Sequence, residues 1–251
     1  MKDEPKSAKV GKREYRRKRL VEIEVSILAI DSSHDAITHA AFDYRQQHVY
    51  PYLESKGFSV IKCQGALARR YYAAEAARQD NVDYLTGVGH GLADAYTGDE
   101  YDPVFQVGDY SPEEVDGKIA HFLACHSALE LGGDFVKHGC RAFFGYSDTF
   151  TCHLEDSDVF FDCDSEVDRA FADGLTAEEV YTRVKAKYDR HVDDLYGEGK
   201  YHLAATLSFN ADRLCAPSVD ARWGDPKARL NDSTLKRKNR RKQPNPESSR
   251  R

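Results

Sequence analysis

Two short apolar runs that end in small residues place the strongest constraint on how this chain can fold. The first covers residues 82–91 and ends in His90-Gly91, and the second covers residues 118–125 and ends in Ala124-Cys125. Each run is closed by small residues after β-branched or aromatic ones, which is typical of a buried parallel strand that stops where a loop begins. If these strands are neighbours, His90 and Cys125 lie side by side at the carboxyl edge of the sheet, where open α/β sheets carry their ligand sites.

Similar patterns predict the other elements of an α/β chain. Strands are expected at residues 21–30, 57–63 and 141–146, and a final edge strand is expected at residues 201–209, where the pattern alternates. Helices are expected from the capping residues 31–35 to about residue 55, and at residues 66–79, 128–138 and 176–195. The last helix opens on a capping box formed by Thr176 and Glu179.

The chain is expected to form one domain between two basic tails. A length of 251 residues with no linker in the middle favours a single folded body, and an apolar content of 41% is enough for a core. We place this body at residues 20–218. Residues 1–19 are expected to form a mobile tail, and residues 219–251 a second tail that buries too little apolar surface to fold.

The net charge of −6 hides a strong asymmetry between the body and the tails. Residues 1–20 hold nine Lys and Arg against three acids, and residues 235–251 hold eight against one, whereas residues 21–234 hold 19 basic and 38 acidic side chains. An acidic body attracts cationic ligands and repels nucleic acid, so contact with nucleic acid is expected only through the tails.

Neither a membrane nor an oxidising compartment is indicated by the sequence. It has no apolar stretch of eighteen residues and no hydrophobic amino-terminal segment, so we expect a cytoplasmic protein that does not contact a membrane. The six cysteines lack paired spacing, which favours reduced thiols. A structural zinc site remains an alternative without a C-x-x-C pair to anchor it. Its ligands would come from Cys125, His126, His138, Cys140, Cys152 and His153.

The His-Gly run followed by the Ala-Cys run resembles the catalytic signature of the caspase-like cysteine peptidases, which include caspases, metacaspases, legumains, gingipains, separases and CHAT domains. His90 and Cys125 are 35 residues apart, fewer than the roughly 50 of caspases. The match continues through residues 131–135 and 141–146 to Asp148. His126 after the cysteine is similar to metacaspases and the acidic turn at Asp148 to CHAT domains, so the subfamily stays open.

This resemblance implies a three-layer α/β sandwich, with a mostly parallel sheet of about six strands and helices on both faces. It also implies a cysteine endopeptidase that needs no cofactor. His90 would take the proton from Cys125, and Cys125 would attack the scissile carbonyl to form an acyl-enzyme that water releases. The oxyanion hole would consist of the N–H groups of Gly91 and Cys125.

Substrate specificity follows from the resemblance together with the acidic body. Relatives that cut after arginine or lysine place carboxylates after the first strand and near the cysteine, and here those positions hold Asp31 and Asp148. Carboxylates make charge-assisted bidentate contacts with a guanidinium, so a basic residue before the scissile bond is expected. Asp94 and Asp99, in the long loop 92–110, are weaker candidates. The alternative is that Asp31 caps a helix and Asp148 makes a turn.

The expected partners are a protein or peptide substrate and an activating or regulatory protein. Small bacterial relatives commonly act in self-destruction or antiviral defence, which makes a dedicated target plausible by family inference. Some metacaspases need calcium, and the acidic segment 151–168 could bind it, although a solvent-facing acidic loop explains that segment equally well. If arginine is preferred, the enzyme could cut its own tails at residues 16–19 or 236–242.

Two other classes of function stay open. An inactive caspase-like module could use the substrate cleft of the fold to bind a partner protein. An enzyme would differ from this module in a thiol that is alkylated much faster than a buried cysteine. A nucleic-acid-binding protein working through its tails would show strong salt dependence.

Overall fold

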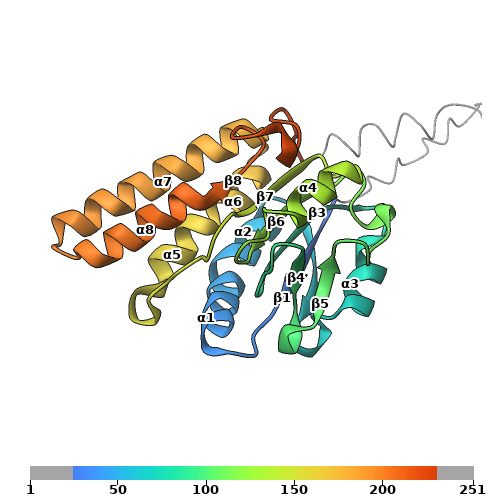
Figure 1. Ribbon diagram of the computed structural model, residues 1–251, viewed down its shortest axis with the longest axis horizontal. Coiled ribbons are helices and arrows are strands. Elements are labelled where there is room, and N and C mark those ends of the chain that lie inside the picture. Colours follow the sequence, from blue (N-terminus) through green and yellow to red (C-terminus); the bar gives the residue numbers. More distant parts are fainter. Residues whose placement is uncertain (1–24, 231–251) are drawn as a thin grey trace, which may run out of the picture.

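Five parallel strands and one short antiparallel strand form the central sheet in a computed structural model that describes residues 25–230 (Figure 1). The strand order is β2-β1-β3-β6-β7-β8, and β8 runs antiparallel to β7. The strands span β1 Ser26–Asp31, β2 Ser59–Gln64, β3 Val82–Val88, β6 Ile119–Leu123, β7 Ala142–Tyr146 and β8 Leu214–Cys215. This arrangement confirms the expected α/β fold with a mostly parallel sheet of about six strands.

The four central strands are buried along their whole length. Every residue of β1, β3, β6 and β7 is buried, whereas the edge strand β2 is mostly half-buried. Strands covered on both faces read as nearly continuous apolar runs. This explains why these four segments were predictable from the sequence.

One face of the sheet is covered by helices from both ends of the chain. Its core includes Ile27, Tyr84 and Phe144 from the strands. The helices on this side are α1 Ala36–Tyr44, α2 Tyr50–Ser55, α5 Ser157–Asp164, α6 Glu166–Ala172, α7 Ala177–Gly197 and α8 Tyr201–Arg213, with a π-turn at Arg45–Val49 between α1 and α2. Helices α7 and α8 lie side by side and extend away from the sheet (Figure 1).

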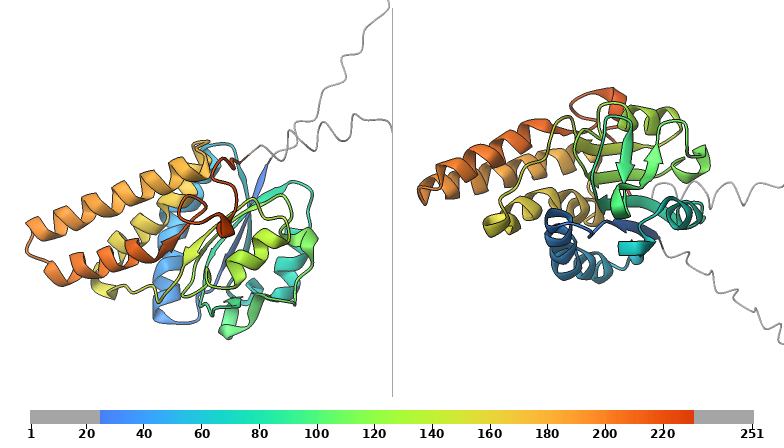
Figure 2. Two further views of the ribbon diagram at one scale, coloured as in Figure 1. Left: turned by 45° about the horizontal axis from the view of Figure 1, so that its top comes forward. Right: turned by 60° about the horizontal axis from the view of Figure 1, so that its bottom comes forward.

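The other face is covered by α3 Arg70–Ala77, α4 Leu131–Lys137 and the antiparallel hairpin of β4 Ala95–Thr97 and β5 Pro103–Gln106. Figure 2 shows these elements gathered on the side of the molecule away from α7 and α8. Phe105, Phe122, Phe135 and Phe143 pack edge to face or tilted beneath them, with ring centroids 5.2 to 6.1 Å apart. The sheet is therefore the middle of three layers.

The predicted edge strand at residues 201–209 is wrong, because this segment lies in helix α8. Leu203, Leu207 and Ala211 are buried at intervals of four residues, so they share one helix face, which packs against α7. The last strand of the sheet is the two-residue β8 instead. Helix α7 begins at the expected capping box of Thr176 and Glu179.

The acidic segment 151–168 is also different from the expected solvent-facing loop. It forms α5 and the start of α6, and Asp164 and Asp168 are fully buried. Within residues 25–230, no helix is both long and apolar enough to cross a membrane.

Residues 219–230 belong to the folded body, so the carboxyl-terminal tail does not begin at residue 219 as expected. Trp223 is buried and donates its indole N–H to the carbonyl of Ala128 at 2.9 Å, and Leu230 is buried as well. The basic segments 16–19 and 236–242 lie outside the described residues.

A buried guanidinium joins the first strand to the helical layer. Arg45, in the π-turn, donates to Asp31 at 3.1 Å and to Asp168 at 2.9 Å, and all three side chains are at most 1% exposed. Arg45 also donates to the Thr86 hydroxyl of β3 at 2.8 Å and to the Tyr50 hydroxyl at 3.1 Å. Removing one member of such a network leaves a buried charge without compensation, which typically costs about 3–5 kcal/mol.

His121 of β6 extends this network toward β7. Its Nδ1 lies 3.2 Å from Asp168 and its Nε2 lies 3.2 Å from Asp164, which also accepts from the Tyr146 hydroxyl. Burial alone would lower the pKa of His121, but the two carboxylates outweigh it and raise the pKa to about 9. Burial would raise the pKa of Asp168, yet Arg45 and His121 hold it well below its usual range. His121 is therefore a buried imidazolium.

The His121 charge should make the stability of the protein depend on pH. Its folded pKa lies above the unfolded value of about 6.5, so its contribution is complete below pH 6.5 and is lost as pH rises toward 9. We expect the free energy of unfolding to fall by up to about 1.4 kcal/mol per pH unit between pH 6.5 and 8.5. Urea unfolding measures this slope.

His121→Asn should be less stable at pH 6.5 and should lose that part of the slope, whereas His39→Asn, at an exposed histidine, should keep it. An unchanged slope in His121→Asn would contradict a charged His121.

Candidate active site

The strand register places His90 beside Cys125. Val88 of β3 pairs with Leu123 of β6, and the Gly89 N–H donates to the Leu123 carbonyl at 3.2 Å. His90 and Cys125 each follow two residues after that pair. A Cβ atom built on Gly91 would lie 2.1 Å from the Cys125 carbonyl oxygen and 3.1 Å from its nitrogen. The two strand ends therefore touch directly, and only glycine fits at position 91.

Two backbone N–H groups at this contact have no carbonyl partner. Within residues 25–230, neither the Gly91 N–H nor the Cys125 N–H donates to a backbone oxygen. Gly91 forms a β-bridge with Tyr96, but the hydrogen bonds of this bridge are made by the neighbouring residues. The neighbouring bonds run from Thr97 N–H to His90 and from Leu92 N–H to Ala95. These two donors are the ones expected to bind a developing oxyanion.

Asp35 fixes the ring of His90. One oxygen of its carboxylate caps α1 by accepting from the N–H groups of Ile37 and Thr38, and the other lies 2.6 Å from His90 Nε2. Burial would raise the pKa of Asp35, but the hydrogen bonds from His90 and from the α1 backbone outweigh it and lower the pKa to about 2. The carboxylate is therefore charged, and it orients the ring so that Nδ1 is the nitrogen left for other contacts.

Two further rings surround His90. Tyr101 stacks on it with centroids 4.7 Å apart and meets His34 edge-on at 4.4 Å. Tyr101 comes from the turn between β4 and β5, and it is 58% exposed. Tyr101 and Glu100 both have positive φ angles, which cost non-glycine residues about 1–2 kcal/mol each. The aromatic ring stacked on His90 is therefore carried by a strained backbone turn at Glu100 and Tyr101.

The Cys125 thiol is partly buried and neutral at rest. Its sulfur lies 4.0 Å from the Phe150 carbonyl oxygen. Burial raises the pKa of Cys125, and the carboxylate of Asp148 raises it further. His126, the next residue, has a φ of +58°, so the chain turns sharply straight after Cys125. Within the described residues, no hydrogen bond joins Cys125 to His90.

The expected pocket carboxylates occupy very different surroundings. Asp31 is fully buried, accepts from Arg45, Tyr50 and Gln64, and has no surface for a substrate, so we omit it from the candidate pocket. Its observed role is to hold the core network together.

Asp148 lies on the surface close to Cys125. It is 47% exposed and its nearest cation is Arg213, at 3.8 Å. Its other contacts are local, since its side chain accepts from the Thr149 N–H and its carbonyl from the His126 N–H. Asp94 accepts from Gln106 of the same segment, and Asp99 pairs with Arg69 at the start of α3, so both already have partners.

The Cys and His residues considered for structural zinc do not gather in the described part of the chain. The six cysteines are all unpaired, and Cys140 is buried with its thiol donating to the Ala142 carbonyl. A different group comes together instead, consisting of His34, Asp35 and His90.

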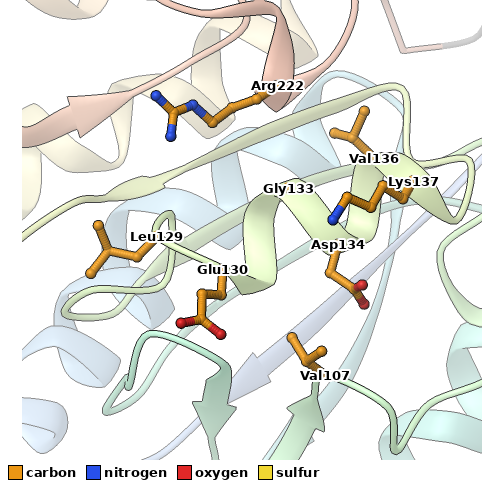
Figure 3. Close-up of a pocket in the computed structure, with 8 residues that line it drawn as sticks. All are labelled: Val107, Leu129, Glu130, Gly133, Asp134, Val136, Lys137 and Arg222. Atoms are coloured by element: carbon orange, nitrogen blue, oxygen red, sulfur yellow. The ribbon is translucent and has the colours of Figure 1, made fainter.

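A surface pocket of about 450 Å³ lies next to α4 (Figure 3). Its lining combines Leu129, Glu130, Asp134 and Lys137 with Arg222, which reaches over it from the carboxyl-terminal segment. Neither His90 nor Cys125 lines this pocket.

Sequence reasoning missed His34, Asp35 and Tyr101 as parts of this site. Asp35 was visible only as a helix cap, although residues 32–35 follow the carboxyl end of a predicted strand, where ligand sites form. No family model matches the chain, and no curated protein is significantly similar to it.

Gly91→Ala should destabilise the protein, because the new methyl group would meet the Cys125 backbone at 2.1 Å. We expect a loss of about 1–3 kcal/mol in the free energy of unfolding, measured by urea denaturation. Gly133→Ala is the matched control, since a Cβ there meets nothing within 4 Å and alanine favours the helix. Equal stability of Gly91→Ala and the wild type would show that the strand ends are not in direct contact.

Proposed function

We propose that this protein is a cysteine endopeptidase that acts through His90 and Cys125. The observation that carries the proposal is the contact of the two strand ends at Gly91. This contact sets an oriented imidazole, a thiol and two N–H groups that have no backbone acceptor within residues 25–230 at one sheet edge. Acyl transfer needs these parts together: a nucleophile, a base held by a third group, and donors for the oxyanion. The resemblance to caspase-like peptidases supports the same assignment.

In the proposed reaction, His90 Nδ1 accepts the proton of the Cys125 thiol as the sulfur attacks the peptide carbonyl. Asp35 stabilises the imidazolium that forms, because its charged carboxylate lies 2.6 Å from Nε2. The N–H groups of Gly91 and Cys125 receive the oxyanion. His90 then protonates the leaving amine, and water releases the acyl group from the sulfur.

The raised pKa of Cys125 supports proton transfer during attack over a resting thiolate–imidazolium pair. Burial and Asp148 both disfavour a negative sulfur before substrate binds. A substrate cation beside Asp148 would neutralise that carboxylate and remove its contribution to the raised pKa of Cys125. Substrate binding would then favour loss of the proton from the Cys125 thiol.

Asp148 supports a preference for arginine or lysine before the scissile bond. Its carboxylate is half-exposed and lies near enough to Cys125 to influence the thiol, and its ion pair with Arg213 is long, at 3.8 Å. A substrate guanidinium can displace such a partner and form shorter, charge-assisted hydrogen bonds.

Hydrolysis of matched fluorogenic peptides ending in Arg, Lys, Asp, Asn or Leu tests the proposal. We expect cleavage after Arg or Lys, with no detectable cleavage by Cys125→Ala or His90→Ala. Asp148→Asn should lower kcat/KM for the Arg peptide by about 10- to 100-fold, which corresponds to a lost charged hydrogen bond. Running the panel with and without calcium tests the need for that ion.

Asp43→Asn, at an exposed carboxylate of α1, is the control for the change of net charge and should cleave like the wild type. Cleavage after Asp or Leu would preserve the His90–Cys125 assignment and refute the basic preference. Cleavage that persists in Cys125→Ala would refute the peptidase mechanism.

A module that binds a partner protein without catalysis is the second candidate, and the raised pKa of Cys125 together with its lack of a hydrogen bond to His90 favours it. Alkylation by iodoacetamide separates the two. A peptidase site should react faster at Cys125 than at Cys152, the other partly exposed cysteine, and His90→Ala should slow that reaction. A binding module should show no effect of His90→Ala.

Self-processing is a further expected consequence of a basic preference. Intact mass spectrometry of the full chain after incubation should reveal cuts near residues 16–19 or 236–242 in the wild type and none in Cys125→Ala. Tails that stay whole in a protein that cleaves Arg peptides would contradict self-processing.

A further inference from the structure

We propose that His34, Asp35 and His90 form a binding site for a divalent transition metal such as Zn²⁺. One ligand atom from each residue lies within 4.8 Å of the other two. The Asp35 oxygen is 2.6 Å from His90 Nε2 and 3.5 Å from His34 Nε2. Ligand atoms around a tetrahedral zinc ion are about 3.4 Å apart, so small side-chain adjustments would place all three around one ion.

The orientation of His34 is the strongest sign of such a site. Its Nδ1 lies 2.7 Å from the Ser32 hydroxyl, which can accept the ring proton and leave a lone pair on Nε2. That Nε2 atom is buried and has no hydrogen-bond partner within residues 25–230. It lies 3.5 Å from the Asp35 carboxylate. A buried nitrogen that makes no hydrogen bond is costly, and metal-binding histidines are typically held through their other nitrogen in this way.

The surroundings suit a transition metal better than calcium. Two imidazoles and one carboxylate are ligands that zinc and related metals accept, whereas calcium prefers oxygen ligands alone. Asp35 is already fixed by its capping contacts to α1, and Tyr101 packs against both histidine rings. The three ligands are therefore held on a rigid helix start and on adjacent strand ends.

Metal binding would also regulate the proposed peptidase, and this consequence rests on the proposed function. A neutral His90 that binds a metal through Nε2 carries its proton on Nδ1. It then has no lone pair with which to accept the Cys125 proton. The carboxylate that orients His90 for proton transfer would thus also help to switch it off, and removing the metal would restore activity.

Direct binding measurements test the site without requiring peptidase activity. Metal-free full-length protein should take up one Zn²⁺ in competition with a chromophoric chelator, and Zn²⁺ should raise its Tm. His34→Ala and Asp35→Asn should raise the Kd at least about tenfold. Asparagine keeps the volume and the capping ability of Asp35, so this variant is expected to fold even if His34→Ala does not.

His39→Ala removes an exposed histidine of the same helix and should bind like the wild type. Cys125→Ala should also bind normally; a large loss there would place the metal on the thiol and overturn the three-residue site. Absence of Zn²⁺ binding to the wild type, or wild-type affinity in both ligand variants, would overturn it as well. Binding by a metal-free protein that neither cleaves peptides nor shows His90-dependent alkylation of Cys125 would refute the proposed function and leave the metal site standing.

Discussion

The buried ion pair network around Arg45 is the constraint on which the rest of this structure depends. Arg45 bridges Asp31 at the end of β1 and Asp168 in α6, and His121 joins Asp168 to Asp164. The network therefore crosses β1, β3 and β6 and attaches helices α5 and α6 to them. Charges buried this deeply are tolerated only in the arrangement that pairs them all. That requirement selects one relation between sheet and helices, and it also fixes the strand ends that carry His90 and Cys125.

The sheet was largely predictable from sequence, but the role of its carboxylates was not. Residues 82–88 and 119–123 are buried on both faces, so an apolar run alone identifies them. By contrast, Asp31 resembles a surface acid at a strand end, but it pairs with the buried Arg45, which also pairs with Asp168, 123 residues further along the chain. Helix α8 was misread because residues 201–209 alternate while also placing apolar residues four apart. Only packing against α7 decides between those patterns.

In the candidate site too, the features set by local sequence were predictable and the contacts between distant segments were not. The order of His90 and Cys125 in two neighbouring strands is a local signal, and β3 and β6 do lie side by side. Asp35 was recognisable as a helix cap, but its second contact depends on β1 lying next to β3, which no single segment of sequence reveals. One carboxylate thus serves both the start of α1 and the ring of His90. A residue with two structural duties of this kind has few acceptable replacements.

The position of Trp223 gives the protein a built-in optical probe. It is the single tryptophan of the chain, and its indole N–H is bonded to Ala128, three residues beyond Cys125. Its emission reports the polarity around that turn, without interference from any other indole. Movement of the carboxyl-terminal segment away from the turn would expose the ring to water and shift the emission to the red, so a change near the thiol becomes visible without a label.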